Sequence, residues 1–360
     1  MRVLIAAGGT GGHIYPGIAV AQEIMRRDGN SKVLFVGTPR GLEGRLVPQA
    51  GFELSLIDSA GLKNVSTMAR ARGLAMLPQS FLSAWSVIKQ FRPDVVVGAG
   101  GYVSGPVVLT AAIARRPTLV MESNALPGWT NRVLARFVDR AAVSFEQALP
   151  FFGGKAVVTG NPVRREFFEI PAKQRDAEKF SLLIFGGSQG ARAINDAMIA
   201  ALPLLKGARL RIKHQTGPLD FERINSAYQE AGWTNLTGDA EVSSYIDNMV
   251  ADFANADVVI CRAGATTTAE LIAAGKASVM IPFPLAADDH QRKNAEALET
   301  SGAARMILQK DLTGKRLAKD IIELAEQPEL INEMEVAIRK LQRGDAAAAA
   351  VNMIEELGGR

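Results

Sequence analysis

The sequence is poor in cysteine and histidine and has no long hydrophobic run. A single cysteine, Cys261, excludes an internal disulfide framework and any zinc or iron–sulfur site built from several cysteines. A reducing cytoplasm is therefore the expected setting. No apolar stretch approaches the roughly 20 residues of a membrane-spanning helix, and the opening residues 2–7 resemble a first strand rather than a signal peptide. We expect a soluble or peripheral protein.

Glycine and aliphatic residues dominate instead. The 360 residues are 48% hydrophobic and 6% aromatic, and they include 34 glycines. Apolar strands that alternate with Ala-rich helices and Gly-rich turns produce such a composition, which favours α/β architecture. The length exceeds what one core usually supports and predicts two domains of about 150 to 200 residues each.

Four apolar segments run directly into glycine-rich or hydroxyl-rich loops. They are Val3–Ala7 before GGTGGH, Val95–Val97 before GAGGYVSG, Leu182–Phe185 before GGSQGA, and Val258–Cys261 before RAGATTTAE. The first and third open similar units about 180 residues apart, which indicates a weak internal duplication. The pattern predicts two doubly wound, parallel-sheet domains of Rossmann type, each with ligand-binding loops at the carboxyl ends of its strands.

A Gly/Pro-punctuated turn at 159–164 marks the expected boundary between these domains. We therefore assign residues 1–161 to an N-terminal domain and residues 162–341 to a C-terminal domain. The Ala-rich stretch 345–357 is predicted to be a helix, and the segment of about 342–360 is expected to pack back on the N-terminal domain. A ligand is expected where the two sets of strand ends face each other across a cleft.

The first glycine-rich loop is suited to a polar or anionic ligand. Glycines 8, 9, 11 and 12 let the backbone approach a ligand, and a helix expected to begin near Tyr15 or Pro16 would direct amide groups toward it. The loop matches neither G-x-G-x-x-G nor Walker A. His13 is a candidate general base at this site, although a structural histidine bonded to the backbone would fit the same position.

The loops of the second half suggest a diphosphate site without a metal. Ser188 and Gln189 are expected at one helix start, and three consecutive threonines follow Ala265 at another. These loops contain no Asp-x-Asp cluster, so helix dipoles and hydrogen bonds, aided by Arg164, are expected to neutralise a diphosphate. Glu270 is either a ribose ligand or a solvated helix residue. Residues 288–291, Asp-Asp-His-Gln, suggest recognition of sugar hydroxyls rather than metal binding.

The segment from Ser59 to Pro93 contains five cations and no acidic residue. Leucine, phenylalanine, tryptophan and isoleucine recur there at the 3–4 spacing of one helical face, at positions 74, 77, 81, 85 and 88. One interpretation is a helix that docks on an anionic membrane surface. The alternative is that the apolar face packs on the core and the cations are solvated.

Eight ordered motifs give the chain a resemblance to one family over nearly its whole length. They are GGTGGHIYP (8–16), GAGGYVSGP (98–106), ESNALPGWTN (122–131), TGNPVR (159–164), GGSQGA (186–191), YIDNM (245–249), CRAGATTTAE (261–270) and DDHQRKNA (288–295). Together they resemble the MurG-type transferases of glycosyltransferase family 28. This resemblance implies the GT-B fold, with the sugar donor bound mainly by the C-terminal domain.

The resemblance also implies roles for individual residues of this chain. The Ile246 backbone would hold uracil, Glu270 the ribose, and Gln291 with His290 the hydroxyls of N-acetylglucosamine (GlcNAc). The diphosphate would lie near Arg164, Ser188, Gln189, Ala265, Thr266, Thr267, Thr268 and Ala269. Thr10, Gly11, Gly12 and Asn124 would complete the donor site, His13 would face the acceptor, and Glu122 is a second candidate base. Lys63, Arg70, Arg72, Leu74, Leu77, Phe81 and Trp85 would contact the membrane. The chain departs from some members at His290 and within ESNALPG.

The activity implied by the resemblance is an inverting transfer of GlcNAc from UDP-GlcNAc. The acceptor would be the C4 hydroxyl of the muramyl-pentapeptide diphospho-undecaprenol called lipid I, and the products lipid II and UDP, for peptidoglycan synthesis. The implied partners are the anionic cytoplasmic face of the plasma membrane and other cell-wall synthesis proteins; no nucleic acid and no cofactor or tightly bound metal are expected. Three alternatives stay open: a diacylglycerol glycosyltransferase, a UDP-GlcNAc 2-epimerase, and a NAD-dependent oxidoreductase, which the missing G-x-G-x-x-G disfavours.

Overall fold

The chain divides into two compact units. A computed structural model describes residues 1–39, 41–59, 67–124, 126–175, 179–234, 239–286, 289–342 and 344–359, with backbone alone for 67–75. Unit 1 comprises Met1–Arg164 and Arg343–Arg360, and unit 2 comprises Arg165–Gln342. The sequence predicts that the C-terminal domain begins at residue 162 and ends at residue 341.

Unit 1 contains a parallel sheet of seven strands in the order β3-β2-β1-β4-β5-β6-β7. The strands are β1 (Arg2–Ala7), β2 (Lys32–Gly37), β3 (Glu53–Leu56), β4 (Val95–Gly100), β5 (Thr118–Glu122), β6 (Arg140–Val143) and β7 (Ala156–Val158). The predicted strands that precede the first two glycine-rich loops are confirmed as β1 and β4. They are hydrogen-bonded neighbours, with Ala7 in register with Gly100.

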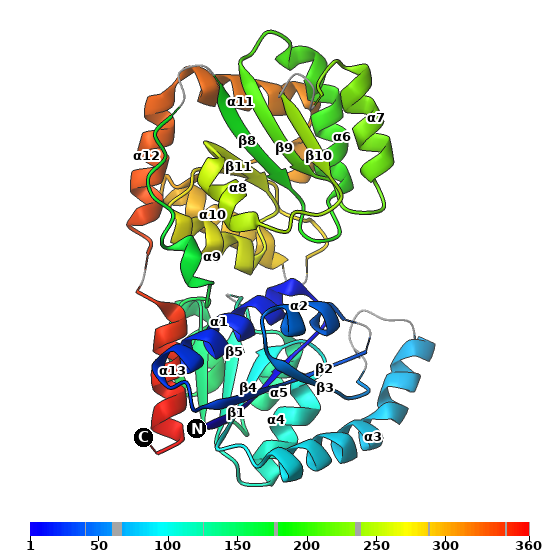
Figure 1. Ribbon diagram of the computed structural model, residues 1–360, viewed down its shortest axis with the longest axis vertical. Coiled ribbons are helices and arrows are strands. Elements are labelled where there is room, and N and C mark those ends of the chain that lie inside the picture. Colours follow the sequence, from blue (N-terminus) through cyan, green and yellow to red (C-terminus); the bar gives the residue numbers. More distant parts are fainter. Residues whose placement is uncertain are drawn as a thin grey trace. The chain divides into compact units, whose positions relative to one another are not determined.

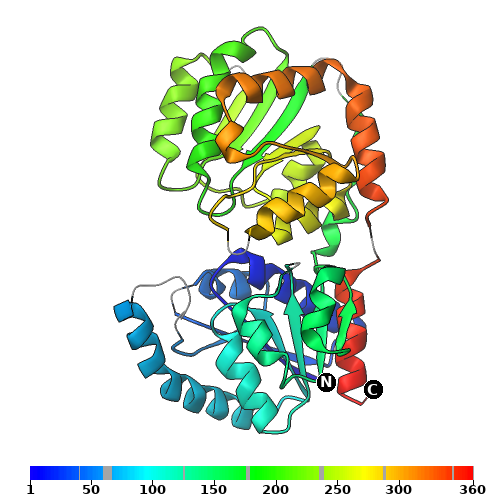
Figure 2. The same cartoon turned by 180° about the vertical axis from the view of Figure 1, so that it is seen from behind.

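Helices cover both faces of this sheet (Figures 1 and 2). They are α1 (Gly11–Arg27), α2 (Glu43–Gln49), α3 (Thr67–Phe91), α4 (Ser104–Ile113), α5 (Trp129–Leu134), the 3-10 helix η1 (Glu146–Phe152) and α13 (Ala346–Leu357). Successive β1 side chains alternate between the faces: Val3 and Ile5 pack in the core with α1 and α13, whereas Leu4 packs in the core with α3 and α4. Burial on both faces explains why the strand is apolar throughout.

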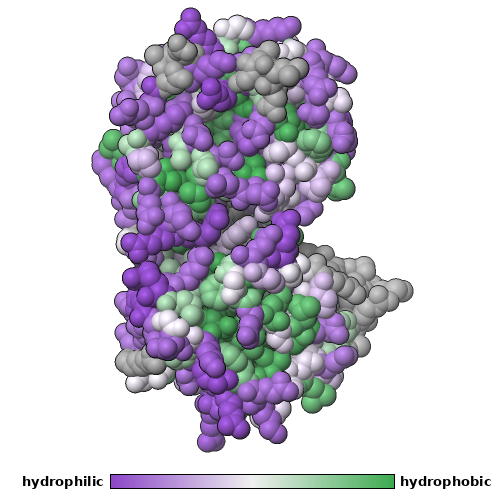
Figure 3. Space-filling view, in the orientation of Figure 1, coloured by the Kyte–Doolittle hydropathy of each residue, from purple (hydrophilic) through white to green (hydrophobic). Residues whose placement is uncertain are grey.

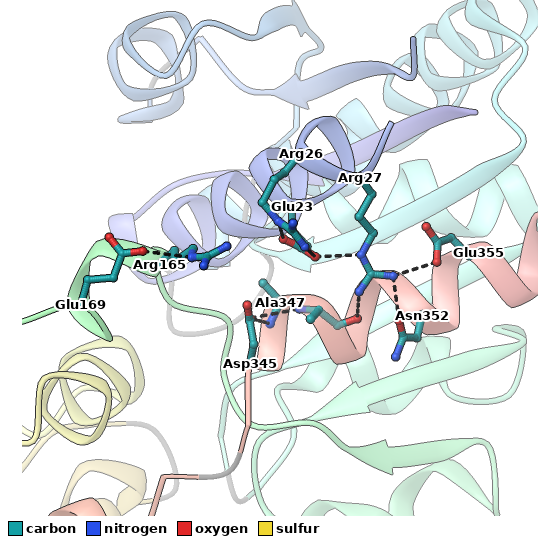
Figure 4. Close-up of polar contacts among 10 residues, drawn as sticks. Glu23, Arg26, Arg27, Arg165, Glu169, Asp345, Ala347, Asn352 and Glu355 are labelled. Atoms are coloured by element: carbon teal, nitrogen blue, oxygen red, sulfur yellow. Dashed lines mark hydrogen bonds and ion pairs between the residues drawn. The ribbon is translucent and has the colours of Figure 1, made fainter. Parts of the chain in front are cut away.

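The C-terminal helix α13 returns to unit 1 and packs beside α1 (Figure 1). Figure 4 shows that Arg27, at the end of α1, connects the two helices. Its guanidinium donates to Glu23 Oε1 at 2.7 Å on α1, and on α13 to Asn352 Oδ1 at 2.7 Å, Glu355 Oε2 at 2.8 Å and the Ala348 carbonyl at 3.0 Å. One side chain therefore ties the last helix to the first.

We expect Arg27→Met to lower the free energy of unfolding of unit 1 by about 2 to 4 kcal/mol, because it leaves Glu23 short of a partner and removes three contacts to α13. Urea denaturation followed by circular dichroism measures the change. The matched control is Arg26→Met: Arg26 also donates two hydrogen bonds to Glu23, but its side chain is 55% exposed, against 22% for Arg27. Equal losses from both variants would contradict a role for Arg27 in anchoring α13.

Unit 2 contains a parallel sheet of six strands in the order β10-β9-β8-β11-β12-β13. The strands are β8 (Phe180–Phe185), β9 (Leu210–Gln215), β10 (Ala240–Ser243), β11 (Val258–Cys261), β12 (Ser278–Met280) and β13 (Ala304–Met306). The helices are η2 (Arg165–Phe167), α6 (Arg192–Ala201), η3 (Leu202–Leu205), α7 (Phe221–Glu230), α8 (Met249–Asn255), α9 (Ala265–Ala274), α10 (His290–Thr300), η5 (Gln309–Asp311), α11 (Gly314–Glu326) and α12 (Pro328–Arg339).

Both sheets have a switch point, at which the chain changes the direction in which it adds strands. In unit 1 it lies between β1 and β4, and in unit 2 between β8 and β11. Ligands of open parallel sheets bind beside the carboxyl ends of the strands at such a point. The four loops singled out in the sequence follow these four strands. The topology therefore places one candidate site on each unit.

Candidate functional site

The loop after β1 is held by its own unit more tightly than the sequence suggests. The amide of Gly8 donates to the Gly100 carbonyl at 3.3 Å, and the amide of Gly9 donates to Glu43 Oε2 at 3.0 Å. The buried Glu43 carboxylate also accepts from the amide and hydroxyl of Thr38 at 2.6 and 2.8 Å. The amides of Gly8 and Gly9 are therefore already engaged by acceptors within unit 1.

The first helix begins earlier than predicted. It starts at Gly11 with Thr10 as N-cap, so Gly11, Gly12 and His13 form its first turn, and Pro16 lies inside it. The sequence predicts a start near Tyr15 or Pro16 instead. The buried side chain of Ile14 packs in the core of unit 1, and this packing extends the helix toward its N-terminus.

His13 lies against the glycine-rich loop after β4. A Cβ built on Gly100 would come within 2.2 Å of His13 Nδ1, so only glycine leaves room for the ring. The ring forms a hydrogen bond with the backbone of Ala99, and burial nonetheless lowers the pKa of His13. Ser104 Oγ bonds the Gly100 amide at 3.0 Å and the Ala6 carbonyl at 2.9 Å, which joins the ends of β1 and β4. The imidazole is thus fixed and neutral near pH 7.

The carboxylate of Glu122, the second candidate base, organises its own loop. It is 4% exposed and accepts four hydrogen bonds of 2.9 to 3.1 Å, from the Asn124 amide and side chain, the Gly128 amide and the Asn131 side chain. Burial raises the pKa of Glu122 despite these donors. With both oxygens engaged, Glu122 is suited to shaping the loop and less suited to taking a proton. Ala125 in this loop lies outside the described residues.

Arg164 is the last residue of the main segment of unit 1. Its guanidinium lies over the ring of Tyr15, with the Cζ atom 5.2 Å from the ring centroid. This cation–π contact links the end of the segment to helix α1. The sequence predicts that Arg164 assists a diphosphate; in the structure its guanidinium contacts Tyr15.

The two phosphate-type loops of unit 2 lie beside each other, because β8 and β11 are paired. After β8, a turn closed by a 2.8 Å bond from the Gly190 amide to the Gly187 carbonyl carries Ser188 and Gln189. Helix α6 begins only at Arg192, so the prediction that Ser188 and Gln189 lie at its start is wrong by three to four residues.

After β11, helix α9 begins at Ala265, as predicted from the threonine-rich motif. Its N-cap, Gly264, has no side chain with which to cap the helix. The amides of the first turn have no acceptor within the helix, which makes this start suited to an anion. Thr268 Oγ1 bonds the Gly264 carbonyl at 3.0 Å and fixes the turn. Ala269 and the buried Glu270 follow one turn into the helix.

The loop before α10 is ordered by the residue expected to bind the sugar. Gln291 Oε1 accepts a 3.0 Å hydrogen bond from the Phe283 amide, and His290 is the first residue of the helix. Ala287 and Asp288 lie outside the described residues. Among the residues that the structure does describe, no group of three or more His, Cys, Asp or Glu side chains is arranged to hold a metal.

Helix α3 presents a different face to the core than the spacing predicts. Ala84 and Ile88 pack in the core and Ser80 is buried, whereas Trp85 is 48% and Leu82 72% exposed. The predicted stripe is wrong in assigning Trp85 to the face of Ile88; Leu77 and Phe81 are partly buried. Lys63 lies outside the described residues, as do the side chains of Arg70, Arg72 and Leu74.

Two buried residues of the site carry no local sequence signal. Glu43 holds the Gly9 amide, and Gln215, the last residue of β9, bonds both the Gly187 carbonyl and the Ile246 amide. Only the pairing of separate loops reveals either role.

Known proteins match the whole chain. The glycosyltransferase family 28 N-terminal domain matches residues 3–143 and the C-terminal domain of that family residues 181–350. The UDP-N-acetylglucosamine–N-acetylmuramyl-(pentapeptide) pyrophosphoryl-undecaprenol N-acetylglucosamine transferase of Pelobacter propionicus is 45% identical, covering 98% of this chain and 99% of its own. The transferase of the same name from Citrifermentans bemidjiense is 47% identical and covers 98% of both chains.

A solved structure of a protein from this family also matches the chain. The crystal structure of MurG from Acinetobacter baumannii superposes with a TM-score of 0.76 at 31% identity, covering 99% of each chain. Together with the two parallel sheets, this match confirms the predicted GT-B fold. The chain therefore belongs to glycosyltransferase family 28 and, within it, to the MurG-type transferases.

Proposed function

We propose that this chain transfers GlcNAc from UDP-GlcNAc to the C4 hydroxyl of the muramyl sugar of lipid I, giving lipid II and UDP. The names of its relatives support this reaction, since they state both the donated sugar and the pyrophosphoryl-undecaprenol acceptor. The observation that carries the proposal is the pair of switch points. One holds a fixed, neutral imidazole, and the other presents helix starts suited to a diphosphate.

In the proposed reaction His13 is the general base. One ring nitrogen is engaged by the backbone of Ala99, and the other takes the proton. As this nitrogen removes the hydroxyl proton, the oxygen attacks the anomeric carbon, and the bond from that carbon to the diphosphate oxygen breaks with inversion. The electron pair leaves with UDP.

The donor contacts belong to unit 2. The first turns of α6 and α9 stabilise the negative charge that develops on the departing diphosphate. Their amides lie at the N-terminal end of the helix, where the helix dipole places partial positive charge. Ser188, Gln189 and the residues from Ala265 to Ala269 surround it, and Glu270 holds the ribose. Gln291 with His290 contacts the GlcNAc hydroxyls. In unit 1, the resemblance implies donor contacts for Thr10, Gly11, Gly12, Asn124 and Arg164.

The test is incubation of the purified protein with labelled UDP-GlcNAc and a short-chain lipid I analogue. The expected result is one UDP released for each GlcNAc transferred. Transfer to diacylglycerol instead would identify a glycolipid synthase. Conversion of UDP-GlcNAc without any acceptor would identify an epimerase, and either outcome would refute the proposed reaction.

Unit 1 is also proposed to dock on an anionic membrane, where the lipid acceptor resides. Helices α3, α4 and α5 are successive neighbours over one sheet face, and they carry the exposed side chains of Leu82, Trp85, Ile113, Trp129 and Val133. Figure 3 shows hydrophobic residues gathered on the visible face of this unit. Cations accompany them at Lys89, Arg115, Arg116 and Arg136. Among the described helices, none has the length and apolarity needed to cross a membrane.

Replacing both Leu82 and Trp85 by glutamate should weaken binding to vesicles that contain phosphatidylglycerol by at least about tenfold, since it removes apolar contacts and adds charges repelled by the lipid. Vesicle cosedimentation measures the binding. Turnover with a water-soluble acceptor should stay within about twofold of wild type. The control is Leu204→Glu, which alters another exposed leucine, in unit 2. Undiminished vesicle binding by the double variant would exclude this face as the docking surface.

A further inference from the structure

Gln215 connects two segments of unit 2 that are far apart in sequence. It is the last residue of β9, and its side chain is 1% exposed. Its Nε2 donates to the Gly187 carbonyl at 2.9 Å, in the loop after β8. Its Oε1 accepts from the Ile246 amide at 2.9 Å, in the segment after β10. One buried amide therefore holds both segments.

The chemistry of the two partners fixes the orientation of the Gln215 amide. A backbone carbonyl can only accept a hydrogen bond and a backbone amide can only donate one, so Nε2 must face Gly187 and Oε1 must face Ile246. A carboxamide, with a donor on one arm and an acceptor on the other, is found only in glutamine and asparagine. Asparagine is one methylene shorter, and a charged or apolar side chain satisfies at most one partner.

The surroundings hold this strand end from both sides. Phe185 of β8 is in register with Gln215, and Val242 and Ser243 of β10 pair with the last two residues of β9. The next residue, Thr216, donates its amide to the Ser243 carbonyl at 3.0 Å. Since the backbone at Gln215 cannot shift easily, its side chain sets the distance between Gly187 and Ile246.

We propose that Gln215 is a positioning residue that fixes the spacing between the diphosphate loop, Gly186–Ala191, and the base-reading segment, Tyr245–Asn248. This inference rests on the proposed function, which puts UDP-GlcNAc on unit 2. The spacing selects a nucleoside diphosphate whose base and phosphates engage both segments at once. Gln215 touches neither the sugar nor the reacting atoms.

The bond to Gln215 also determines how the base is read. Because the Ile246 amide is engaged by Oε1, the Ile246 carbonyl is the group that meets the base. That carbonyl accepts a hydrogen bond from the N3–H of uracil. Cytosine has an unprotonated N3 with a lone pair, which the same carbonyl repels. Gln215 thus supports selection of uridine over cytidine nucleotides by holding the carbonyl in place.

The test uses Gln215→Met and Gln215→Glu in the full chain. Methionine keeps the volume but leaves the Gly187 carbonyl and the Ile246 amide without partners, so both segments shift. We expect the KM for UDP-GlcNAc to rise about tenfold to a hundredfold, with kcat within about threefold of wild type. The ratio of the inhibition constants of CDP and UDP should fall by at least about tenfold.

Gln215→Glu adds a pH signature that a general loss of stability would not produce. An ionised glutamate accepts from the Ile246 amide, but its second oxygen faces the Gly187 carbonyl and repels it. Protonation restores a donor, so the KM of this variant should fall toward the wild-type value as the pH is lowered through the pKa of the new carboxyl group. The matched control is Gln342→Met, which removes two side-chain bonds, to the Ile272 and Ala273 carbonyls at the far end of α9, and should leave all these constants unchanged.

The outcomes separate this inference from the proposed function. If wild type does not bind UDP in calorimetry, the proposed function fails, and the inference fails with it. If wild type binds UDP while Gln215→Met has wild-type KM and nucleotide preference, the inference alone is overturned. A fall in kcat at unchanged KM overturns it as well. Should Gln215→Met not fold, the pH response of Gln215→Glu decides, because it is measured within one folded protein.

Discussion

Replacing His13 by alanine is expected to lower kcat by about a hundredfold to ten-thousandfold, because it removes the imidazole that we propose as the general base. The KM for UDP-GlcNAc should stay within about threefold of wild type, since most donor contacts belong to unit 2. Steady-state kinetics with the lipid I analogue measures both constants. His13→Gln is the matched control for shape: it keeps a donor for the backbone of Ala99, yet it cannot act as a base. Its turnover should be as low as that of the alanine variant.

The pH profile gives His13 a second signature. Burial lowers the pKa of this imidazole below the value of about 6.5 that is usual for histidine. The neutral form is the active one, so kcat is maximal above the lowered pKa and declines as the pH falls through it. The acid limb of wild type should therefore lie below pH 6.5 and be absent from the residual activity of both variants. Normal turnover by His13→Ala or His13→Gln would exclude His13 from the chemistry.

The architecture could be predicted because the signals for it are local. A strand buried on both faces must be apolar at every position, as the segments at Val3–Ala7 and Leu182–Phe185 are. The glycine-rich loops after these strands mark the carboxyl ends at which ligands bind. Two such units in tandem predict two doubly wound domains, and each of the four predicted strand-to-loop junctions is present in the structure.

The details of the loops depend on residues far away in sequence. Glu43 captures the Gly9 amide across 34 positions, and Gln215 reaches Gly187 across 28. The sequence near Gly9 or Gly187 contains no pattern that predicts either contact. The face that α3 buries was equally hard to predict, because Leu77, Phe81 and Trp85 are all apolar. Which of them packs on the sheet depends on how α4 lies beside α3.

Gly190→Ala should have a large effect on unit 2, because Gly190 has the shortest Cβ contact among the glycines described there. Gly190 has a φ of +76°, and a Cβ built on it would lie 1.8 Å from the Thr216 carbonyl oxygen. Gly217 packs against the same loop, because a Cβ built on Gly217 would lie 2.2 Å from the Gln189 carbonyl oxygen. The two loops thus pack glycine against backbone, and neither can give way without moving a strand end. The diphosphate loop can approach Gln215 closely only because both positions lack a side chain.

We expect Gly190→Ala to lower the free energy of unfolding of unit 2 by about 3 kcal/mol or more, because it adds a backbone clash to the strain of a left-handed conformation. The affinity for UDP should fall at least about tenfold, since the turn carrying Ser188 must move. Urea denaturation and calorimetry with UDP measure the two effects. Gly232→Ala is the matched control: its φ is +83°, but a Cβ there meets no atom within 4 Å among the described residues. Gly232→Ala should lower the free energy of unfolding by only about 1 kcal/mol, from backbone strain alone, and should leave UDP binding intact. Equal losses of unfolding free energy in the two variants would mean that the loops move apart easily to accommodate a methyl group. The spacing that we assign to Gln215 would then not be rigid.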